Sequence, residues 1–298
     1  MSREVHSIWR CWTDLFIVVY SKVGEQAVSR FDLTEAGDEQ FSSPYSVACN
    51  SRGETIVADK DNNRIQVFDR NGKFLFKFGS EGPGNGQFSY PRGVTVDQRN
   101  NQIVVADTGK HRIQIFDEMG ICLGVFGSKG NRDGQFSFPY GVVVDRQGNY
   151  VVADRSNNRI QIFNSQGQFV RKFGSEGKGN GQVNSPVGVG LLSNANIVVS
   201  EFDNHRLQIF EPQGNFVRMV SAGQVKGPCH LFVDSDDSIL VVDDGNGRIQ
   251  VFNQNGHHIK SIGTGQLVNP RGVCMDREGR IIVSEAPVLG GVHRISIF

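Results

Sequence analysis

The sequence has few cysteines, no excess of charge and no long apolar run. Its five cysteines are odd in number and widely spaced, with no C-x-x-C pair, which argues against a disulfide framework and a zinc finger. We therefore expect reduced cysteines, as in an intracellular protein. The apolar run LFIVVY at 15–20 is too short to span a bilayer or to form the core of a signal peptide. We expect a cytoplasmic chain that does not bind membranes.

Composition narrows the class further. The 31 basic and 31 acidic residues cancel, which excludes a uniformly basic coat for nucleic acid but not a basic patch on one face. Proline is scarce, with 9 residues, whereas glycine is abundant, with 36 of 298. Abundant glycine without abundant proline, and without a G-X-Y period, predicts many tight turns rather than collagen or a flexible linker.

Internal repeats dominate the rest of the sequence. Each copy opens with a proline and continues with short β-branched segments bounded by Gly, Asn and Asp, such as PRGVTVD at 91–97. The opening prolines are Pro44, Pro91, Pro139, Pro186, Pro228 and Pro270, which are 42 to 48 residues apart. Four short strands in such a period are typical of a propeller blade. The sequence therefore predicts an all-β, six-bladed β-propeller.

Segments within a copy differ in their apolar pattern. Residues 103–106, IVVA, are apolar throughout, which predicts a strand buried on both faces. Residues 112–116, RIQIF, alternate, which predicts a strand with one wetter face. Dipeptides such as Asn71-Gly72 and Met119-Gly120 supply the positive φ that a tight hairpin requires.

The chain ends predict how the ring closes. The sixth copy stops at its third strand, 294–298. A strand near Ala27–Phe31 is expected to complete that blade, which leaves no open sheet edge. We therefore assign residues 21–298 to the propeller and residues 1–20 to a segment of uncertain role. That segment is either a linker or an alternative third strand that competes with 294–298.

The repeated signature resembles that of NHL repeats. It reads Pro-x-Gly-Val-x-Val-Asp, Ile-x-Val-Ala-Asp and Asn/His-Arg-Ile-Gln-x-Phe, with linkers such as FGSEGPGNGQF at 78–88. Six such repeats are similar to the C-terminal propeller of the TRIM-NHL family. The resemblance implies an RNA-binding module of a post-transcriptional, translational repressor, with single-stranded or stem-loop RNA of mRNA 3′ regions as its partner. The alternative that it implies is a platform that recruits protein substrates or partners for a TRIM-type ubiquitin ligase. We expect the propeller itself to be monomeric.

Three histidines occupy one repeated position but do not predict a metal site. His111, His205 and His293 lie before the third strand, where Asn63 and Asn158 stand in other copies. NHL-type amidating lyases use metal-bound histidines, yet those enzymes are secretory and disulfide-bearing, unlike this chain. G-x-S-x-G and P-loop motifs are absent. We expect no metal, no cofactor and no enzyme, with any ubiquitin-ligase activity in a RING domain that this chain lacks.

An acid–arginine pair recurs in every copy: the acidic residue stands at the end of the second strand and the arginine at the start of the third. A carboxylate and a guanidinium that flank a short loop form a charge-assisted bridge, which predicts a structural clamp in each blade rather than a catalytic site. The pairs are Asp59/Arg64, Asp107/Arg112, Asp154/Arg159, Glu201/Arg206, Asp243/Arg248 and Glu285/Arg294.

Other charges separate by face. The inter-blade loops and the loops between second and third strands carry nine basic residues against six acidic ones. The opposite hairpin turns carry seven against twelve. This asymmetry predicts a basic face that binds phosphates. For a protein platform, the apolar loop 286–291 on the same face is the expected contact.

Residues after the opening prolines are expected near the mouth of the central channel. Tyrosine and arginine side chains there either stack bases and contact phosphates or merely line a solvent-filled channel. RNA-binding NHL domains use these positions and the adjacent loops, and Arg92 and Arg271, expected in loops, match best. Val187 and Cys229 do not fit a polar pattern. The expected RNA-binding residues are Tyr45, Lys60, Arg92, Lys110, Tyr140, Arg155, Lys178, His230 and Arg271.

Overall fold

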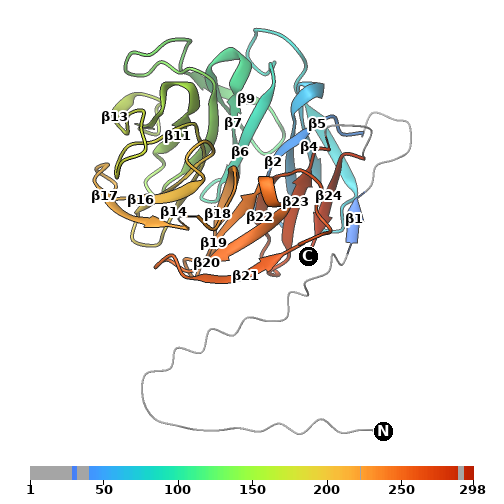
Figure 1. Cartoon of the computed structure of the whole chain (residues 1–298). Helices are drawn as coiled ribbons and strands as arrows, with labels where there is room; N and C mark the ends of the chain where they lie inside the picture. Colours follow the sequence, from blue (N-terminus) through green and yellow to red (C-terminus); the bar gives the residue numbers. More distant parts are fainter. Residues whose placement is uncertain (1–28, 32–39, 222, 288–291) are drawn as a thin grey trace, which may run out of the picture.

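Short antiparallel sheets surround a central axis in the computed structural model (Figure 1). The structure describes residues 29–31, 40–221, 223–287 and 292–298. Among these residues there are six sheets of four strands each, which we call blades 1 to 6. The prediction of an all-β, six-bladed propeller is confirmed. None of the helical turns in the described ranges is long and apolar enough to cross a membrane.

Every blade begins at its opening proline, and its first strand lies innermost. Blade 1 consists of β2 (Pro44–Cys49), β3 (Thr55–Asp59), β4 (Arg64–Phe68) and β5 (Phe74–Phe78). Blade 2 consists of β6 (Pro91–Asp97), β7 (Gln102–Asp107), β8 (Arg112–Phe116) and β9 (Cys122–Phe126). Blade 3 consists of β10 (Pro139–Val144), β11 (Tyr150–Asp154), β12 (Arg159–Phe163) and β13 (Phe169–Phe173).

The second half of the ring repeats this order. Blade 4 consists of β14 (Pro186–Leu191), β15 (Ile197–Glu201), β16 (Arg206–Phe210) and β17 (Phe216–Val220). Blade 5 consists of β18 (Pro228–Val233), β19 (Ile239–Asp243), β20 (Arg248–Phe252) and β21 (His258–Ile262). Blade 6 consists of β22 (Pro270–Met275), β23 (Ile281–Glu285), β24 (Arg294–Ile297) and β1 (Ser29–Phe31). Single 3-10 turns follow four of the second strands: η1 (Lys60–Asn62), η2 (Thr108–Lys110), η3 (Arg155–Asn157) and η4 (Asp244–Asn246).

The N-terminal strand closes the ring as predicted. β1 pairs antiparallel with β24, with Ser29 opposite Ile297 and Phe31 opposite Ile295. The sixth sheet therefore combines the two ends of the chain in the order β1-β24-β23-β22. Residues 1–20, and the alternative pairing considered for them, lie outside the described residues.

The core consists of layers between adjacent blades. Phe116, at the end of a third strand, and Phe88, in an inter-blade loop, are fully buried, and their rings lie 5.5 Å apart. Residues 103–106 are 0–3% exposed, which confirms the prediction of a strand buried on both faces. The predicted wetter face of residues 112–116 is wrong. Gln114 is fully buried. Its burial is tolerated because its amide group donates to Asp107 Oδ2 and to the carbonyl oxygen of Gln87.

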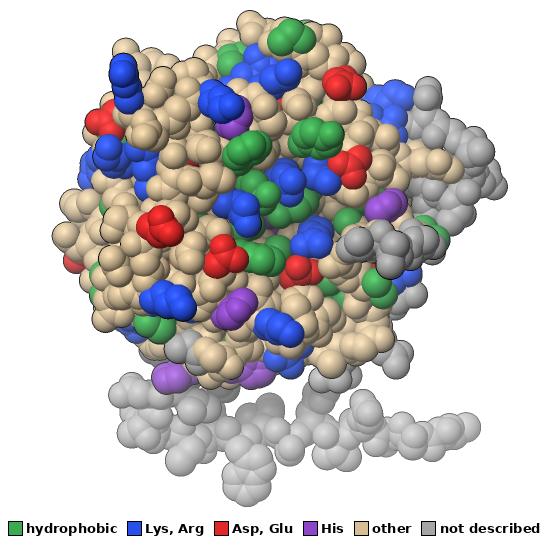
Figure 2. All heavy atoms as spheres, turned by 45° about the horizontal axis from the view of Figure 1, so that its top comes forward, with side chains coloured by type: hydrophobic (Ala, Val, Ile, Leu, Met, Phe, Trp, Pro, Cys, Tyr) green, Lys and Arg blue, Asp and Glu red, His purple; other side chains and the backbone are tan. Residues whose placement is uncertain are grey.

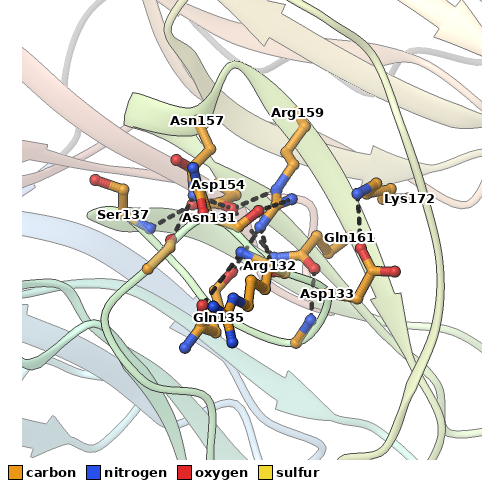
Figure 3. Close-up of polar contacts among 12 residues, drawn as sticks. Asn131, Arg132, Asp133, Gln135, Ser137, Asp154, Asn157, Arg159, Gln161 and Lys172 are labelled. Carbon is orange, nitrogen blue, oxygen red and sulfur yellow. Dashed lines mark hydrogen bonds and ion pairs between the residues drawn. The ribbon is translucent and has the colours of Figure 1, made fainter.

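All six predicted clamps are present. The acid and arginine lie 2.7–2.9 Å apart in each, and every acidic side chain is fully buried. In blade 3, Asp154 accepts from Arg159 Nε, Asn157 Nδ2, Gln161 Nε2 and the backbone N–H of Ser137 (Figure 3). The last of these donors belongs to an inter-blade loop. The clamp therefore ties two loops together as well as two strands.

The arginine of the clamp continues this network. Arg159 also donates to the carbonyl oxygens of Asn131, Arg132 and Gln135 in the inter-blade loop (Figure 3). Arg206 makes the corresponding bonds to the loop at 178–182. Since several charge-assisted bonds converge on each guanidinium, the long glycine-rich loops are held in fixed positions. These loops form one face of the disc.

Candidate functional site

Inter-blade loops and the loops between second and third strands meet on one side of the disc, which we call the loop face. The backbone N–H of Gly109 donates to Ser89 O, that of Ser156 to Ser137 O and that of Gly245 to Lys226 O, at 2.8–3.0 Å. Hairpin turns such as 145–149 and 276–280 lie at the other ends of the strands, on what we call the turn face. The two sets of loops are thus segregated as predicted.

The centre of the loop face is hollow. A cavity of about 490 Å³ opens there, and Figure 2 shows Lys and Arg side chains gathered around the hollow with hydrophobic side chains between them. Six of the nine predicted RNA-binding residues line this cavity: Tyr45, Lys60, Arg92, Tyr140, Arg155 and Arg271. The structure therefore brings residues from blades 1, 2, 3 and 6 together at the channel mouth.

Arginine and tyrosine side chains alternate within this cavity. The Arg92 guanidinium lies 4.8 Å from the ring centre of Tyr45 and 4.5 Å from that of Tyr140. On Tyr140, Arg155 is also stacked, at 4.9 Å. Each contact is a cation–π interaction that fixes the guanidinium over a ring. Two like charges therefore share one aromatic ring.

Neither of these arginines is neutralised. Within the described residues, Arg92 and Arg155 form no ion pair, and the buried Nε of each lacks a hydrogen-bond acceptor. Two guanidiniums with unused donors lie close together in a hollow, which is the chemistry that suits an anion, because a phosphate or carboxylate would supply both the charge and the acceptors.

The other two cations of the cavity are paired. Arg271 Nη1 lies 2.8 Å from Asp244 Oδ2, and its Nη2 donates to Asn269 Oδ1. Lys60 Nζ lies 2.8 Å from Asp61 Oδ1. Burial opposes ionisation of Asp61, but its hydrogen bonds with Lys60 and Ser43 outweigh that effect and lower its pKa. The cations without an ion pair are thus Arg92 and Arg155, and the charge of Arg92 also helps to lower the pKa of Asp61. The sequence instead singles out Arg92 and Arg271 as the best match.

The expected location of Arg92 and Arg271 in loops is wrong. They are the second residues of β6 and β22. The strand register shifts directly after Pro91 and after Pro270, so neither arginine pairs across to the next strand. The register shift explains how Arg92 and Arg271 belong to first strands and still line the channel mouth. The sequence pattern does not show this shift.

His230 differs from its expected role. It does not line the cavity but lies buried beneath it, with its ring edge-on to Tyr45 at 5.7 Å and its Nε2 without a partner. Burial lowers the pKa of His230 to about 4, and Arg92 adds to that effect. The ring is therefore neutral near pH 7 and supports Tyr45 from below. Tyr45 itself is only 7% exposed, since Arg92 covers its ring.

The remaining predicted residues lie away from the centre. Lys110 ends η2, and Lys178 borders a separate hollow of about 330 Å³ together with Asp203, His205 and Met219. Val187 lines the central cavity, whereas Cys229 is buried beside Arg271, where burial raises the pKa of the thiol to about 12. Of these two positions only Val187 belongs to the cavity wall, which is apolar there and at Phe202.

Sequence reasoning missed two exposed aromatic residues on this face. Tyr90 and Phe138 directly precede opening prolines and are 51% and 44% exposed. Both have left-handed backbones, with φ of 53° and 52°, an unfavourable conformation for aromatic residues. The backbone N–H of Tyr90 donates to Asn63 Oδ1, and that of Phe138 to His111 Nδ1. An aromatic residue before the proline, where other copies have Ser, Gly or Asn, was the available signal.

These contacts also explain two of the three repeated histidines, whereas Nδ1 of the third, His293, has no hydrogen-bond partner among the described residues. His111 and His205 accept backbone N–H groups of the following inter-blade loop through Nδ1, as Asn63 and Asn158 do through Oδ1. Histidine and asparagine alternate because each offers an acceptor at the same place. No group of three or more potential metal ligands occurs among the residues that the structure describes.

Comparisons with known proteins agree with this architecture. Residues 36–122 match the family model of the 6-bladed beta-propeller, and residues 136–163 match that of the NHL repeat. The chain carries an NHL repeat. It is 44% identical over 64 residues to the protein brain tumor of Drosophila melanogaster and 43% identical over 42 residues to the protein lin-41 of Caenorhabditis elegans. These segments cover 22% and 14% of this chain, but only 6% and 4% of the two relatives.

Solved structures extend the comparison to the whole ring. The virginiamycin B lyase of Staphylococcus aureus has a TM-score of 0.62 and 17% identity, over 87% of this chain and 85% of that one. The gluconolactonase XC5397 of Xanthomonas campestris has a TM-score of 0.68 and 13% identity, over 87% and 86%. At these identities, the likeness shows the fold alone.

These matches contradict the prediction that the chain is not an enzyme. That prediction rested on the absence of catalytic motifs such as G-x-S-x-G and the P-loop from the repeats. A lyase and a gluconolactonase have folds similar to that of this chain. Because one fold hosts both binding and catalysis, the prediction that this chain is not an enzyme is wrong.

Proposed function

We propose that this chain is a cytoplasmic RNA-binding module that holds single-stranded or looped RNA on its loop face, as part of a translational repressor of the TRIM-NHL type. The observation that carries the proposal is the pair of uncompensated guanidiniums, Arg92 and Arg155, stacked on Tyr140 in the central cavity. Partial similarity to the NHL regions of brain tumor and lin-41 supports it.

The chemistry of the face suits a nucleic acid with unpaired bases. Arg92 and Arg155 supply donors for backbone phosphates at the centre. Tyr90 and Phe138, exposed on the inter-blade loops, supply flat rings on which bases stack. Lys110 and Lys178, at the rim, extend the positive charge outward. The combination of a charged centre and aromatic rings fits single strands and loops better than a paired duplex, whose bases are already stacked.

The test begins with the selection of RNA from a random pool on the wild-type chain. The retained sequence is then titrated against Arg92→Glu/Arg155→Glu. We expect the double reversal to weaken binding well over ten-fold. We also expect the slope of log affinity against log salt to become shallower by about 1.4, at roughly 0.7 for each single-strand phosphate that the variant no longer neutralises. Melting temperatures check that the variant is folded.

Matched controls lie on the turn face. Arg146 and Arg277 are exposed there, and Arg146→Glu/Arg277→Glu makes the same change in net charge. This variant should bind RNA as the wild type does. Equal losses in the two double variants would mean that binding depends on net charge alone, and would refute the assignment of the site.

The aromatic residues are tested separately. Tyr90→Ala and Phe138→Ala should each weaken binding by about 1–3 kcal/mol if a base stacks on the ring. Tyr140→Ala should remove both a ring and the support of two arginines. If the random pool yields no retained RNA at physiological salt, the RNA proposal fails. A protein captured through the loop that begins at Ala286 and Pro287 would then favour the recruitment platform; residues 288–291 of that loop lie outside the described residues.

A further inference from the structure

Two cysteines that are 225 positions apart in the sequence lie in contact across the ring closure. Cys49 ends β2 of blade 1, and Cys274 lies in β22 of blade 6. Their sulfur atoms are 3.3 Å apart. Both are free thiols, and both line a channel cavity of about 250 Å³ that is separate from the central cavity of the loop face.

The repeat geometry makes this contact a fixed one. Cys274 is the fourth residue after its opening proline, and Cys49 is the fifth after its own. At the junction of blades 4 and 5, the corresponding positions are Gly190 and Val233, where an added Cβ on Gly190 would lie 2.8 Å from a Val233 methyl group. The ring thus presses these two positions together. At the other junctions they hold Ala48/Val96, Thr95/Val144, Val143/Leu191 and Phe232/Met275.

We propose that Cys49 and Cys274 are a redox pair that forms a reversible disulfide and closes the propeller covalently. The oxidant is a low-molecular-weight disulfide such as oxidised glutathione. The Cys49 thiolate attacks one sulfur of that disulfide, and one glutathione thiolate leaves. Cys274 then gives up its proton and attacks Cys49 Sγ, and the second glutathione leaves. Two protein thiols are oxidised, and one glutathione disulfide is reduced to two thiols.

Accessibility sets the order of these steps. Cys49 is partly exposed, whereas Cys274 is 2% exposed. Burial also raises the pKa of the Cys274 thiol, so it remains protonated and does not meet the oxidant first. It needs only to reach the neighbouring sulfur, which is already in contact. A bond of about 2.05 Å requires a small rotation of side chains on two adjacent strands.

The bond would change how the ring is held. In the reduced chain, β24 at the C-terminal end is fastened to the start of the chain by the three-residue strand β1. A bond between Cys49 and Cys274 joins the innermost strands of blades 1 and 6, so the covalent circle passes through every blade. The ring then stays closed even when β1 separates from β24.

The experiment uses the full chain, fully reduced and then incubated with oxidised glutathione at pH 8. Peptide mass spectrometry should find Cys49 linked to Cys274, and the melting temperature should rise by about 5 °C or more, since the bond closes a very long loop. Dithiothreitol should reverse both changes. Cys49→Ser and Cys274→Ser should show neither, whereas Cys122→Ser, a matched control in blade 2, should behave as the wild type.

Three results would overturn the proposal. The first is a stable glutathione adduct on Cys49 without the internal bond. The second is a bond between 49 and 274 that forms only in urea, where the native contact is absent. The third is a native bond that leaves the melting temperature unchanged. The comparison of wild type with and without dithiothreitol needs no variant, so it is decisive even if a serine substitution impairs folding.

Discussion

Removal of one clamp carboxylate, by Asp107→Ala, should destabilise the propeller without changing its ligand surface. Asp107 is fully buried and accepts hydrogen bonds from Arg112 Nε at 2.8 Å, the backbone N–H of Ser89 at 2.7 Å and Gln114 Nε2 at 3.1 Å. Breaking a buried ion pair by removing one partner typically costs about 3–5 kcal/mol. The alanine variant leaves all three donors without this acceptor.

Two observations place the expected cost below the top of that range. Arg112 keeps the carbonyl oxygens of Pro83, Gly84 and Gln87 as acceptors, and its side chain is 11% exposed. Burial raises the pKa of Asp107 in spite of its donors, so desolvation offsets part of what the bridge contributes. We expect a loss of about 2–4 kcal/mol in the free energy of unfolding.

Urea unfolding at pH 7, followed by circular dichroism, measures this loss. Asp133→Ala is the control, because Asp133 pairs with Lys172 at 2.6 Å while both side chains are about half exposed. Such surface pairs contribute about 0–1 kcal/mol. RNA affinity of the folded fraction should hardly change in either variant. If Asp107→Ala is as mild as Asp133→Ala, or abolishes binding while stability is retained, the clamp is not structural and the reasoning fails.

Two further predictions concern stability. Deletion of residues 1–34 removes β1 and leaves β24 as an open edge, so the protein should aggregate or melt at a clearly lower temperature; an unchanged, monomeric variant would show that β1 is dispensable. The pKa of His230 is about 4 when folded, against 6.5 for an unperturbed histidine. The unfolded state therefore takes up the proton first, and stability is lost as pH falls below about 6.5. From pH 7 to 5 the wild type should lose about 2 kcal/mol more than His230→Gln in urea unfolding, and equal losses would contradict the burial of a neutral ring.

Features that repeat with the blade period were predictable from the sequence. The opening prolines, the buried strand at 103–106 and the six acid–arginine pairs each recur, so one copy explains the others. The alternation at 112–116 misled because Gln114 is polar yet faces inward, where a loop carbonyl and a clamp acid satisfy it. Alternation of apolar and polar residues shows which side chains are polar, not which are exposed. Here the polar side chain of Gln114 belongs to the hydrogen-bond network of the interior.

Features that depend on the exact juxtaposition of blades were not predictable. Nothing in the spacing indicates that Cys49 meets Cys274, since that contact requires the register of both strands and the closure of the ring. The pairing of Arg271 with Asp244 likewise depends on where η4 of blade 5 lies relative to blade 6. Most of the residues expected at the channel mouth do line the cavity. Contacts between blades decide which of their charges lack an ion pair, and the sequence does not show these contacts.

The residues before the opening prolines of blades 2, 3 and 4 are each held by a backbone hydrogen bond. Tyr90 and Phe138 are fixed through their N–H groups by acceptors from the preceding blade, and Ser185 is fixed in the same way by Asn158. The side chains add contacts of their own, since the Phe138 ring lies 4.5 Å from that of His111 and Lys60 Nζ lies 5.8 Å from the ring centre of Tyr90. Because the backbone bond itself does not depend on the type of side chain, the same scaffold carries Tyr, Phe or Ser at these positions, and a substitution there changes the chemistry of the rim.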